Sequence, residues 1–329
     1  MRLLIKLSIS SRFLLFVLSL VPALALAGNT NAMEWIQSMS EAMRNLSYRG
    51  NFVYMHDNQL ESMSIAHTRN KSGEKERLLS LNGEAREVIR DDKNLTCIWP
   101  ASRKVVVDFS RKNNFSPIFI PDDIENISQL YNFEMVGKDR IAGQATTVVQ
   151  IRPKDRFRYG LKFWINKENH LMMKSILVDE NNRAVEQVMF TNLELVADPA
   201  DIVFDAVPVI DENYTLVRFH SGDNSGQTGT ESSWQTRSIP AGFRQKSILK
   251  RHDVDTNQAS YQMVYTDGLA SLSIFIEKRS PQLKLGKMSM GAVNAYIRHL
   301  DDYMVTAIGE VPEVTVKSMA ESIFYRGSE

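Results

Sequence analysis

The feature of this sequence that most constrains its fold is a long series of short, strand-like segments between residues 48 and 195. The segments are rich in β-branched and aromatic residues, and clusters of Asn, Asp, Gly and Lys separate them. They cover residues 48–55, 62–69, 76–81, 84–90, 95–99, 104–109, 146–151, 159–165, 172–179 and 185–195. Asn82-Gly83 is typical of a tight hairpin turn, because both residues tolerate the positive φ of a type I′ turn. The pattern predicts a large antiparallel meander.

A sheet of this size has to curl around its own apolar face or be covered by helices. An amphipathic helix is predicted before the first strand, with its apolar positions at helical spacing. These positions are Trp35, Ile36, Met39, Ala42, Met43 and Leu46. Residues 124–130 are expected to form a second, short helix on or inside the curve. We therefore expect a half-open antiparallel β-barrel with helices in the N-terminal part of the chain.

The remainder of the chain is expected to form a second, smaller domain. Residues 221–230 are small and polar, which is typical of a linker. Beyond them, residues 243–249, 260–266 and 269–277 are strand-like, and a terminal helix is expected just after Pro312. The fold class is therefore α+β, with a barrel domain at 28–198, a linker at 199–233 and a C-terminal α+β domain at 234–329.

The first residues have the pattern of a secretory signal peptide. Arg2, Lys6 and Arg12 precede an apolar run over residues 13–26 that ends in Ala25-Leu26-Ala27. The run is short for a membrane span of about 20 residues, although an uncleaved anchor is the alternative. We place the signal peptide at residues 1–27, with cleavage after Ala27, and expect a protein that works outside the cytoplasm.

The composition offers little machinery for an enzyme. The 39 basic residues balance the 39 acidic ones, so no overall positive field would attract nucleic acid. The histidines are scattered without a metal-ligand spacing, and the motifs of hydrolases, NTPases and dinucleotide-binding enzymes are missing. Cys97 is the only cysteine, so it forms no intrachain disulfide, and we favour a structural role for it over a reactive thiol. We expect no catalytic residue, no metal and no cofactor.

Two groups of residues are candidates for ligand binding. Large apolar side chains of the strands could line a lipid cavity if the sheet curls without closing, although ordinary core packing is the alternative for each: Trp99, Phe109, Phe163 and Trp164. Cations cluster at the mouth of one hairpin and could receive an anionic head group or an acidic peptide: Arg152, Lys154, Arg156 and Arg158. The alternative for this second group is a solvated loop whose cations pair with neighbouring carboxylates.

Several segments, taken in order, resemble the RseB/MucB family of periplasmic regulators of the envelope-stress sigma factor. The most telling is Glu76-Arg77-Leu78-Leu79-Ser80-Leu81-Asn82-Gly83-Glu84-Ala85-Arg86-Glu87-Val88-Ile89-Arg90. The similarity continues through residues 137–143, 153–160, 265–270, 275–277, 290–296 and 309–312. Each motif is weak alone, and their common order over nearly the whole mature chain makes the resemblance specific.

The resemblance implies a function as well as a fold. It implies an N-terminal domain similar to lipoprotein carriers, with a cavity for lipid, joined to a smaller α+β domain. It further implies a non-enzymatic, periplasmic protein that binds the periplasmic part of a transmembrane anti-sigma factor and shields it from proteolysis. A lipid or lipopolysaccharide signal would release that partner. The alternative is a periplasmic lipid or lipoprotein carrier, and formation of a homo-oligomer is left open.

The resemblance and the residue types also suggest where a partner would bind. Gly291, Asn294 and Tyr296 combine accessible backbone with an aromatic anchor, and residues 269–277 would adjoin them. A tight internal packing corner is the alternative. The linker over residues 221–230 would permit two domain arrangements, so lipid in one domain could weaken a contact made by the other. Direct competition between lipid and partner is the competing mechanism.

Overall fold

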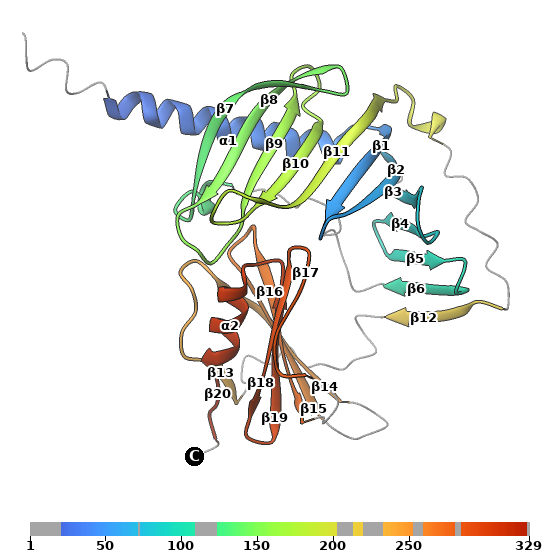
Figure 1. Ribbon diagram of the computed structural model, residues 1–329. Helices are drawn as coiled ribbons and strands as arrows, with labels where there is room; N and C mark the ends of the chain where they lie inside the picture. The colour runs from blue at the N-terminus through green and yellow to red at the C-terminus, as the bar shows by residue number, and fades with distance from the viewer. Residues whose placement is uncertain are drawn as a thin grey trace, which may run out of the picture.

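The computed structural model describes residues 21–71, 73–108, 124–202, 213–219, 233–252, 259–279 and 284–327. It shows a mostly-β protein with two domains, each built on its own sheet, and few helices (Figure 1). Part of the predicted signal peptide and most of the predicted linker lie outside the described residues.

The N-terminal domain contains a 12-stranded sheet in the order β12-β6-β5-β4-β3-β2-β1-β11-β10-β9-β8-β7. Its strands are β1 (Tyr48–His56), β2 (Gln59–Asn70), β3 (Gly73–Ser80), β4 (Glu87–Asp91), β5 (Leu95–Trp99), β6 (Lys104–Asp108), β7 (Tyr131–Ile141), β8 (Gln144–Pro153), β9 (Gly160–Asn166), β10 (Met172–Val178), β11 (Ala184–Leu195) and β12 (Thr215–Phe219). Two antiparallel meanders meet where β1 pairs with both β2 and β11. β12 runs parallel to β6. The strand order is linear, so the sheet is open, and Figure 1 shows that it is curved.

The helix α1 (Val21–Asn45) lies along β7 and β8. Its spacing places Ala32, Ile36 and Met39 on one buried face, where they join the core formed by strand residues such as Val149 and Phe163. The predicted amphipathic helix is confirmed over its expected residues. It begins earlier than expected and runs through the predicted cleavage point.

For this domain, one local prediction is confirmed in part, one strand was missed and one turn was wrong. The segment at 124–130 does contain a short helix, the 3-10 helix η1 (Glu125–Ile127), which is shorter than the predicted range. β7 was missed, because its alternation is lost after Met135, where a bulge at residues 135–137 breaks the register with β8. Asn82-Gly83 does not form a two-residue turn; Ser80 N bonds to Arg86 O across a longer loop. Asn82 holds this loop to β2, accepting from Ser62 N at 2.6 Å and donating to Leu60 O at 3.2 Å.

Buried charged residues fix the end of α1 to the sheet. His67 Nδ1 lies 2.8 Å from Leu46 O, and its Nε2 lies 3.3 Å from Glu74 Oε1. Arg90 on β4 pairs with Glu74 and Glu76 on β3. Burial acts to raise the pKa of Glu74, but the hydrogen bond with His67 and the charge of Arg90 outweigh it and lower that pKa to about 2. Burial raises the pKa of Glu76, although Arg90 opposes the rise.

The C-terminal domain is a six-stranded antiparallel sheet in the order β14-β15-β16-β19-β18-β17. Its strands are β14 (Arg244–His252), β15 (Ala259–Thr266), β16 (Ser271–Lys278), β17 (Gly286–Met290), β18 (Val293–Leu300) and β19 (Tyr303–Gly309). The helix α2 (Glu313–Ser322) packs on one face, and β13 (Trp234–Thr236) pairs with β20 (Ile323–Tyr325). The terminal helix just after Pro312 is confirmed.

The strands β17, β18 and β19 were not predicted, which is why this domain is more β-rich than expected. Both faces of β19 are buried, with Val305 and Ala307 in the α2 core and Met304 on the opposite face. Ile297 on β18 is likewise buried on that opposite face. Such strands lack the alternation of apolar and polar residues that marks a strand with one solvated face.

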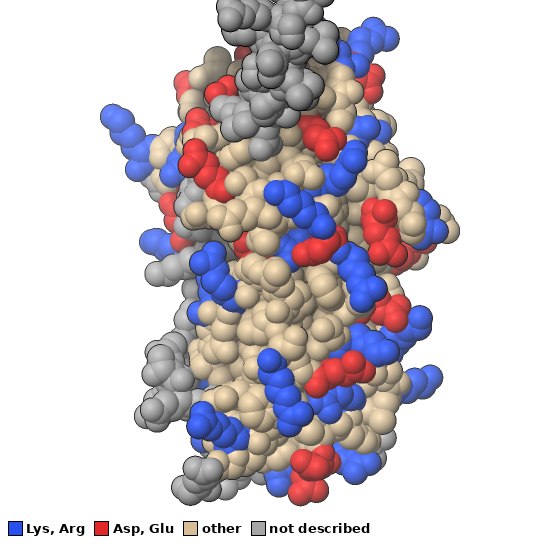
Figure 2. All heavy atoms as spheres, turned by 90° about the vertical axis from the view of Figure 1, so that its left-hand side faces the viewer, with Lys and Arg blue, Asp and Glu red and all other residues tan. Residues whose placement is uncertain are grey.

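The surface charges are mixed. On the face shown in Figure 2, basic and acidic side chains alternate over both domains without a large region of one sign. This agrees with the equal numbers of acidic and basic residues in the sequence. A single-sign field of the kind that attracts polyanions does not form on this face.

Candidate functional site

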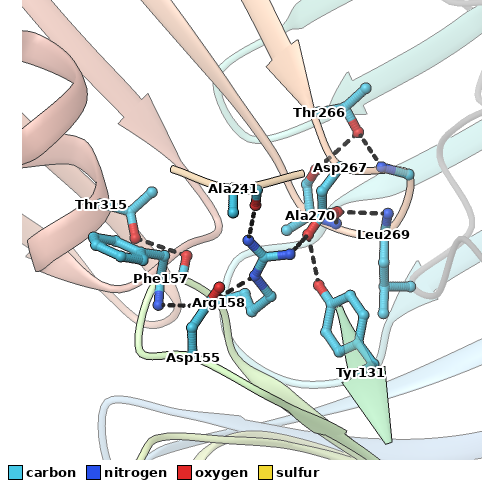
Figure 3. Close-up of polar contacts among 11 residues, drawn as sticks. Tyr131, Asp155, Phe157, Arg158, Ala241, Thr266, Asp267, Leu269, Ala270 and Thr315 are labelled. Atoms are coloured by element: carbon cyan, nitrogen blue, oxygen red, sulfur yellow. Dashed lines mark hydrogen bonds and ion pairs between the residues drawn. The ribbon is translucent and has the colours of Figure 1, made fainter. Parts of the chain in front are cut away.

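The most elaborate polar cluster in the described residues lies where the two domains meet (Figure 3). We call it the domain junction: Tyr131 and the β8–β9 loop, residues 154–159, on the N-terminal side, and the turn between β15 and β16, residues 267–270, with Ala241 and Thr315 on the C-terminal side. Each side is shaped by its own local hydrogen bonds before the two meet. The junction is therefore formed by two preorganised turns.

On the N-terminal side, Asp155 folds the β8–β9 loop. Its Oδ1 accepts from Phe157 N at 2.9 Å and from Arg158 Nε at 3.1 Å. An aspartate that bonds the backbone two residues ahead is a common turn-forming arrangement. Here it directs the Arg158 guanidinium toward the C-terminal domain (Figure 3).

On the C-terminal side, Asp267 uses its two carboxylate oxygens differently. Oδ1 accepts from Leu269 N at 2.8 Å and Ala270 N at 2.7 Å, and so shapes its own turn. Oδ2 accepts from Arg158 Nη1 and from Tyr131 Oη, both at 2.9 Å. One carboxylate therefore fixes the turn and joins the domains.

Arg158 is the central residue of the junction. Its side chain is 0% exposed, as is that of Asp267. Its Nη2 donates to Ala241 O at 2.5 Å, and the guanidinium lies 5.1 Å from the ring centroid of Phe243 and 5.5 Å from that of Tyr131. Burial raises the pKa of Tyr131 well above its usual value, and the charge of Asp267 raises it further, so its hydroxyl stays a donor. Removing one member of such a buried ion pair strongly destabilises a protein, because the other charge is left buried without a partner.

Apolar and backbone contacts complete the junction. Leu269 packs against the N-terminal core, and a Cβ at Gly242 would overlap the side chain of Leu130. Thr315 Oγ1, near the start of α2, donates to Phe157 O at 2.7 Å. The loop thus contacts the C-terminal domain at both the β15–β16 turn and α2.

A second interdomain contact lies at the turn between β17 and β18. Gly291 N donates to Asp57 Oδ2 at 2.5 Å, and Ala292 N donates to Glu186 Oε1 at 2.8 Å. Nearby, Asn294 Nδ2 donates to Tyr159 Oη at 2.9 Å. The carboxylates of the N-terminal domain therefore hold the backbone of this turn.

The four residues proposed to line a lipid cavity do not converge. Phe163 and Trp164 are both buried, but as successive residues of β9 they point to opposite faces of the sheet. Trp164 donates from Nε1 to Asp139 Oδ2 at 2.8 Å and lies close to Lys162 and Lys174. Trp99 is half-buried on β5, and its alternation places it with Cys97 on the face that carries the core. Phe109 lies outside the described residues. One cavity cannot be lined by both Phe163 and Trp164.

The four cations proposed for an anionic ligand also separate. Arg152 pairs with Glu134 at 3.3 Å, and Lys154 Nζ donates to Ser128 O at 2.9 Å. Arg156 is exposed and lies 5.7 Å from the Phe157 ring centroid. Only Arg158 is buried, and its acidic partner is Asp267 of the other domain. The described geometry favours the alternative that these cations pair within the protein.

The residues proposed for partner binding belong largely to the molecule's interior. Asn294 is buried and also donates to Ala292 O and, at 2.8 Å, to Val311 O. Tyr296 packs partly against the α2 core, and Gly291 forms the turn described above. This is the arrangement of an internal packing corner.

The sequence reasoning missed the residues that join the domains, above all Asp267, Tyr131, Asp57 and Glu186. Arg158 and Asp267 did lie in two of the segments that resemble the RseB/MucB family, residues 153–160 and 265–270. Within the described residues, no group of histidine, cysteine and acidic side chains could hold a metal ion. No helix among them has the length and apolar character to cross a membrane.

Comparison with known protein families accounts for both domains. Residues 31–208 match the MucB/RseB N-terminal domain, and residues 228–324 match the MucB/RseB C-terminal domain. The chain belongs to the MucB/RseB family. This is a family of sigma-factor regulatory proteins, which are not enzymes. Two of the segments in the sequence that resemble the family, residues 153–160 and 265–270, meet in the domain junction.

Individual relatives extend over nearly the whole chain. The sigma factor AlgU regulatory protein MucB of Pseudomonas aeruginosa is 28% identical, over 94% of this chain and 96% of its own. The sigma-E factor regulatory protein RseB of Haemophilus influenzae is 23% identical, over 93% of this chain and 95% of its own. A crystal structure of MucB in complex with MucA(peri) is similar with a TM-score of 0.66 at 25% identity, covering 90% of this chain and 100% of that one. The MucB/RseB match thus includes both domains and the segment between them.

Proposed function

We propose that this protein is a periplasmic negative regulator of an envelope-stress sigma factor. It binds the periplasmic part of a transmembrane anti-sigma factor and shields it from proteolysis. The observation that carries the proposal is the likeness to MucB in complex with MucA(peri), which covers 90% of the chain. The signal-peptide pattern over residues 1–27 supports the periplasmic location.

The fold supports a second ligand. We infer that the curved, open sheet of the N-terminal domain is a half-open barrel and that a lipid would bind on its apolar inner face. Trp99 is the retained candidate among the proposed lining residues, because its alternation with Cys97 supports a place on that face and its side chain is half-buried, whereas Phe163 is fully buried. A lipid or lipopolysaccharide that favours one domain arrangement over the other would shift the partner's affinity.

The domain junction supports coupling between the two ligands. Arg158 and Asp267 connect the loop beside β9 to the turn beside β16, so a change in the N-terminal sheet can be transmitted to the C-terminal sheet through a polar contact. Interfaces of this kind have discrete packed and separated arrangements. Lipid binding would weaken the junction and release the anti-sigma factor.

The test uses the mature protein and the periplasmic fragment of a MucA-like anti-sigma factor. Titration calorimetry is expected to show binding, and the site-specific protease that cuts the fragment is expected to slow when the protein is added. Lipopolysaccharide is then expected to restore cleavage. If the fragment does not bind, and the protein instead moves lipid between vesicles, the carrier function replaces the regulator. Native mass spectrometry of the same samples reports retained lipid and any homo-oligomer.

A further inference from the structure

The strand β17 is an edge of the C-terminal sheet, and among the described residues β18 is the one strand with which its backbone pairs. Its turn to β18 has two residues, Gly291 and Ala292, with Met290 opposite Val293. In a hairpin with a two-residue turn, the residues that close the turn exchange both backbone hydrogen bonds, and bonded and non-bonded pairs alternate from there. The pairs formed by Ser289 and Lys287 are therefore the non-bonded ones. Their N–H and C=O groups point away from β18, where a further strand would pair.

The side chains of this strand are apolar on one face. Met290 is 71% exposed and Met288 is 55% exposed, and residues two apart on a strand share a face. On β18 the same face continues with Ala295 and Ile297, which lie opposite Met288 and Gly286. Methionine adapts its shape to a range of apolar partners. β17 thus offers free backbone groups next to an adaptable apolar strip.

Two other edge strands in the described residues are protected against such pairing. β14, at the opposite edge of the same sheet, carries Arg244, Lys246 and Lys250 and has an irregularity between Gln245 and Ser247. β7, at one edge of the N-terminal sheet, contains a bulge at residues 135–137 and lies beside α1. Charges, bulges and covering helices are the usual means by which proteins block edge pairing. β17 has one charged residue, Lys287, and no break in its register with β18.

The edge is also held in place by the N-terminal domain. Gly291 and Ala292, which follow β17, donate to Asp57 and Glu186. Figure 1 shows the β17 end of the C-terminal domain beside the lower end of β1. A segment paired with β17 would therefore continue an existing interdomain contact, and a change in domain arrangement would move this edge relative to the N-terminal sheet.

We propose that β17 accepts an extended segment of the anti-sigma factor as an additional strand, a proposal that rests on the function proposed above. The segment has apolar side chains at alternate positions, which contact Met288 and Met290, and an acidic residue near Lys284. Lys284 is exposed and β17 itself has no acidic residue, whereas Lys287 already pairs with Glu313 of α2 at 3.2 Å. A second copy of this edge would add another Lys284 and no acidic residue of β17 to meet it, whereas an acidic segment neutralises Lys284.

The test compares variants of the mature protein in titrations with the periplasmic anti-sigma fragment. Ser289→Pro removes an outward N–H, and an edge strand tolerates proline at such a position. It is expected to weaken binding about fivefold or more, the factor that one net backbone hydrogen bond provides. Ser289→Ala keeps the N–H and is the matched control, expected to bind within about twofold of the parent. Met288→Lys with Met290→Lys leaves the backbone intact, and it is expected to weaken binding at least tenfold, because it places charge in the apolar strip.

Amide hydrogen exchange gives an independent reading that does not depend on substitutions. The amides of Lys287 and Ser289 are expected to exchange quickly in the free protein and to become protected when the fragment binds. Unchanged affinity in both Ser289→Pro and the double methionine variant, or unchanged exchange at these two amides, would overturn the proposal. Loss of self-association instead of fragment binding in these variants would also overturn it, in favour of a second copy. Failure of the parent protein to bind the fragment would count against the proposed function itself.

Discussion

Replacing Arg158 by methionine is expected to destabilise the protein and to weaken the energetic coupling between the two domains. The substitution keeps much of the volume and leaves the carboxylate of Asp267 buried without its cation. Breaking a buried pair by removing one partner costs roughly 3–5 kcal/mol. Asp267 would retain its hydrogen bonds from Tyr131, Leu269 and Ala270. We therefore expect the free energy of unfolding to fall by about 3 kcal/mol, at the lower end of that range.

The double variant Arg158→Met with Asp267→Asn measures the pairwise part of this cost. With both charges removed, no uncompensated charge remains, so the second substitution is expected to be less harmful in the Arg158→Met background. We expect the double variant to be about 2 kcal/mol more stable than the sum of the two single effects predicts. The single asparagine oxygen can keep the bonds from Leu269 N and Ala270 N, and the amide nitrogen then faces Tyr131, whose hydroxyl can accept from it.

The assay is calorimetric unfolding of the parent, both single variants and the double variant. Coupled domains unfold together, whereas domains that have lost their shared contact unfold as separate transitions. The parent is expected to show one transition and Arg158→Met two. Strictly additive effects of the two substitutions, or an unchanged single transition in Arg158→Met, would refute the argument that this pair joins the domains.

Three further results are expected. Glu74→Gln should make the stability of the protein less sensitive to acid, because the pKa of Glu74 is lowered to about 2 in the folded state. The ionised carboxylate contributes at most about 3 kcal/mol to the free energy of unfolding above pH 4.5, and this contribution is lost as the pH falls toward 2. Urea unfolding across that pH range measures the loss, and the same decline of stability in the parent and in Glu74→Gln would contradict the prediction. Gly291→Ala should lower the free energy of unfolding by about 1–2 kcal/mol, because φ is +57° and the added Cβ would lie 2.5 Å from Glu186 Oε1. Gly327→Ala is the neutral control in the same urea titration, because a Cβ there meets nothing within 4 Å. Trp99→Ala should weaken binding of a fluorescent acyl probe. Trp164→Ala should leave it unchanged, because alternation along β9 turns Trp164 to the face opposite Phe163, where it lies close to Lys162 and Lys174. Equal losses in both variants would contradict this assignment.

Much of the fold could be predicted because it depends on local patterns. Strands such as β1 and β10 follow their alternation, and α1 and α2 follow helical spacing and Pro312. The bulge in β7 and the double burial of β19 removed those patterns, and these strands were missed. The Asn82-Gly83 turn failed because Asn82 bonds to β2, a contact between segments distant in sequence.

The domain junction could not be predicted, because its chemistry depends on pairing across the two domains. Arg158 belongs to a loop rich in cations, and the sequence gives no sign that it alone is buried. Its partner Asp267 looks like an ordinary turn residue, and one of its oxygens has that role. Phe163 and Trp164 were both proposed to line one cavity, but successive residues of a strand point to opposite faces, and the sequence does not say which of the two faces inward.

The central claim is that lipid releases the partner by changing how the two domains are arranged. A disulfide at positions 56 and 291 would prevent that change, because a Cβ at Gly291 would lie 3.6 Å from the Cβ of His56, within the range for a disulfide. The protein to measure carries His56→Cys, Gly291→Cys and Cys97→Ala, and its reduced form is the matched control. Loaded with the anti-sigma fragment and titrated with lipopolysaccharide, the reduced form is expected to release the fragment and the oxidised form to retain it while still binding lipid. Equal release from both forms would contradict the domain mechanism and support direct competition.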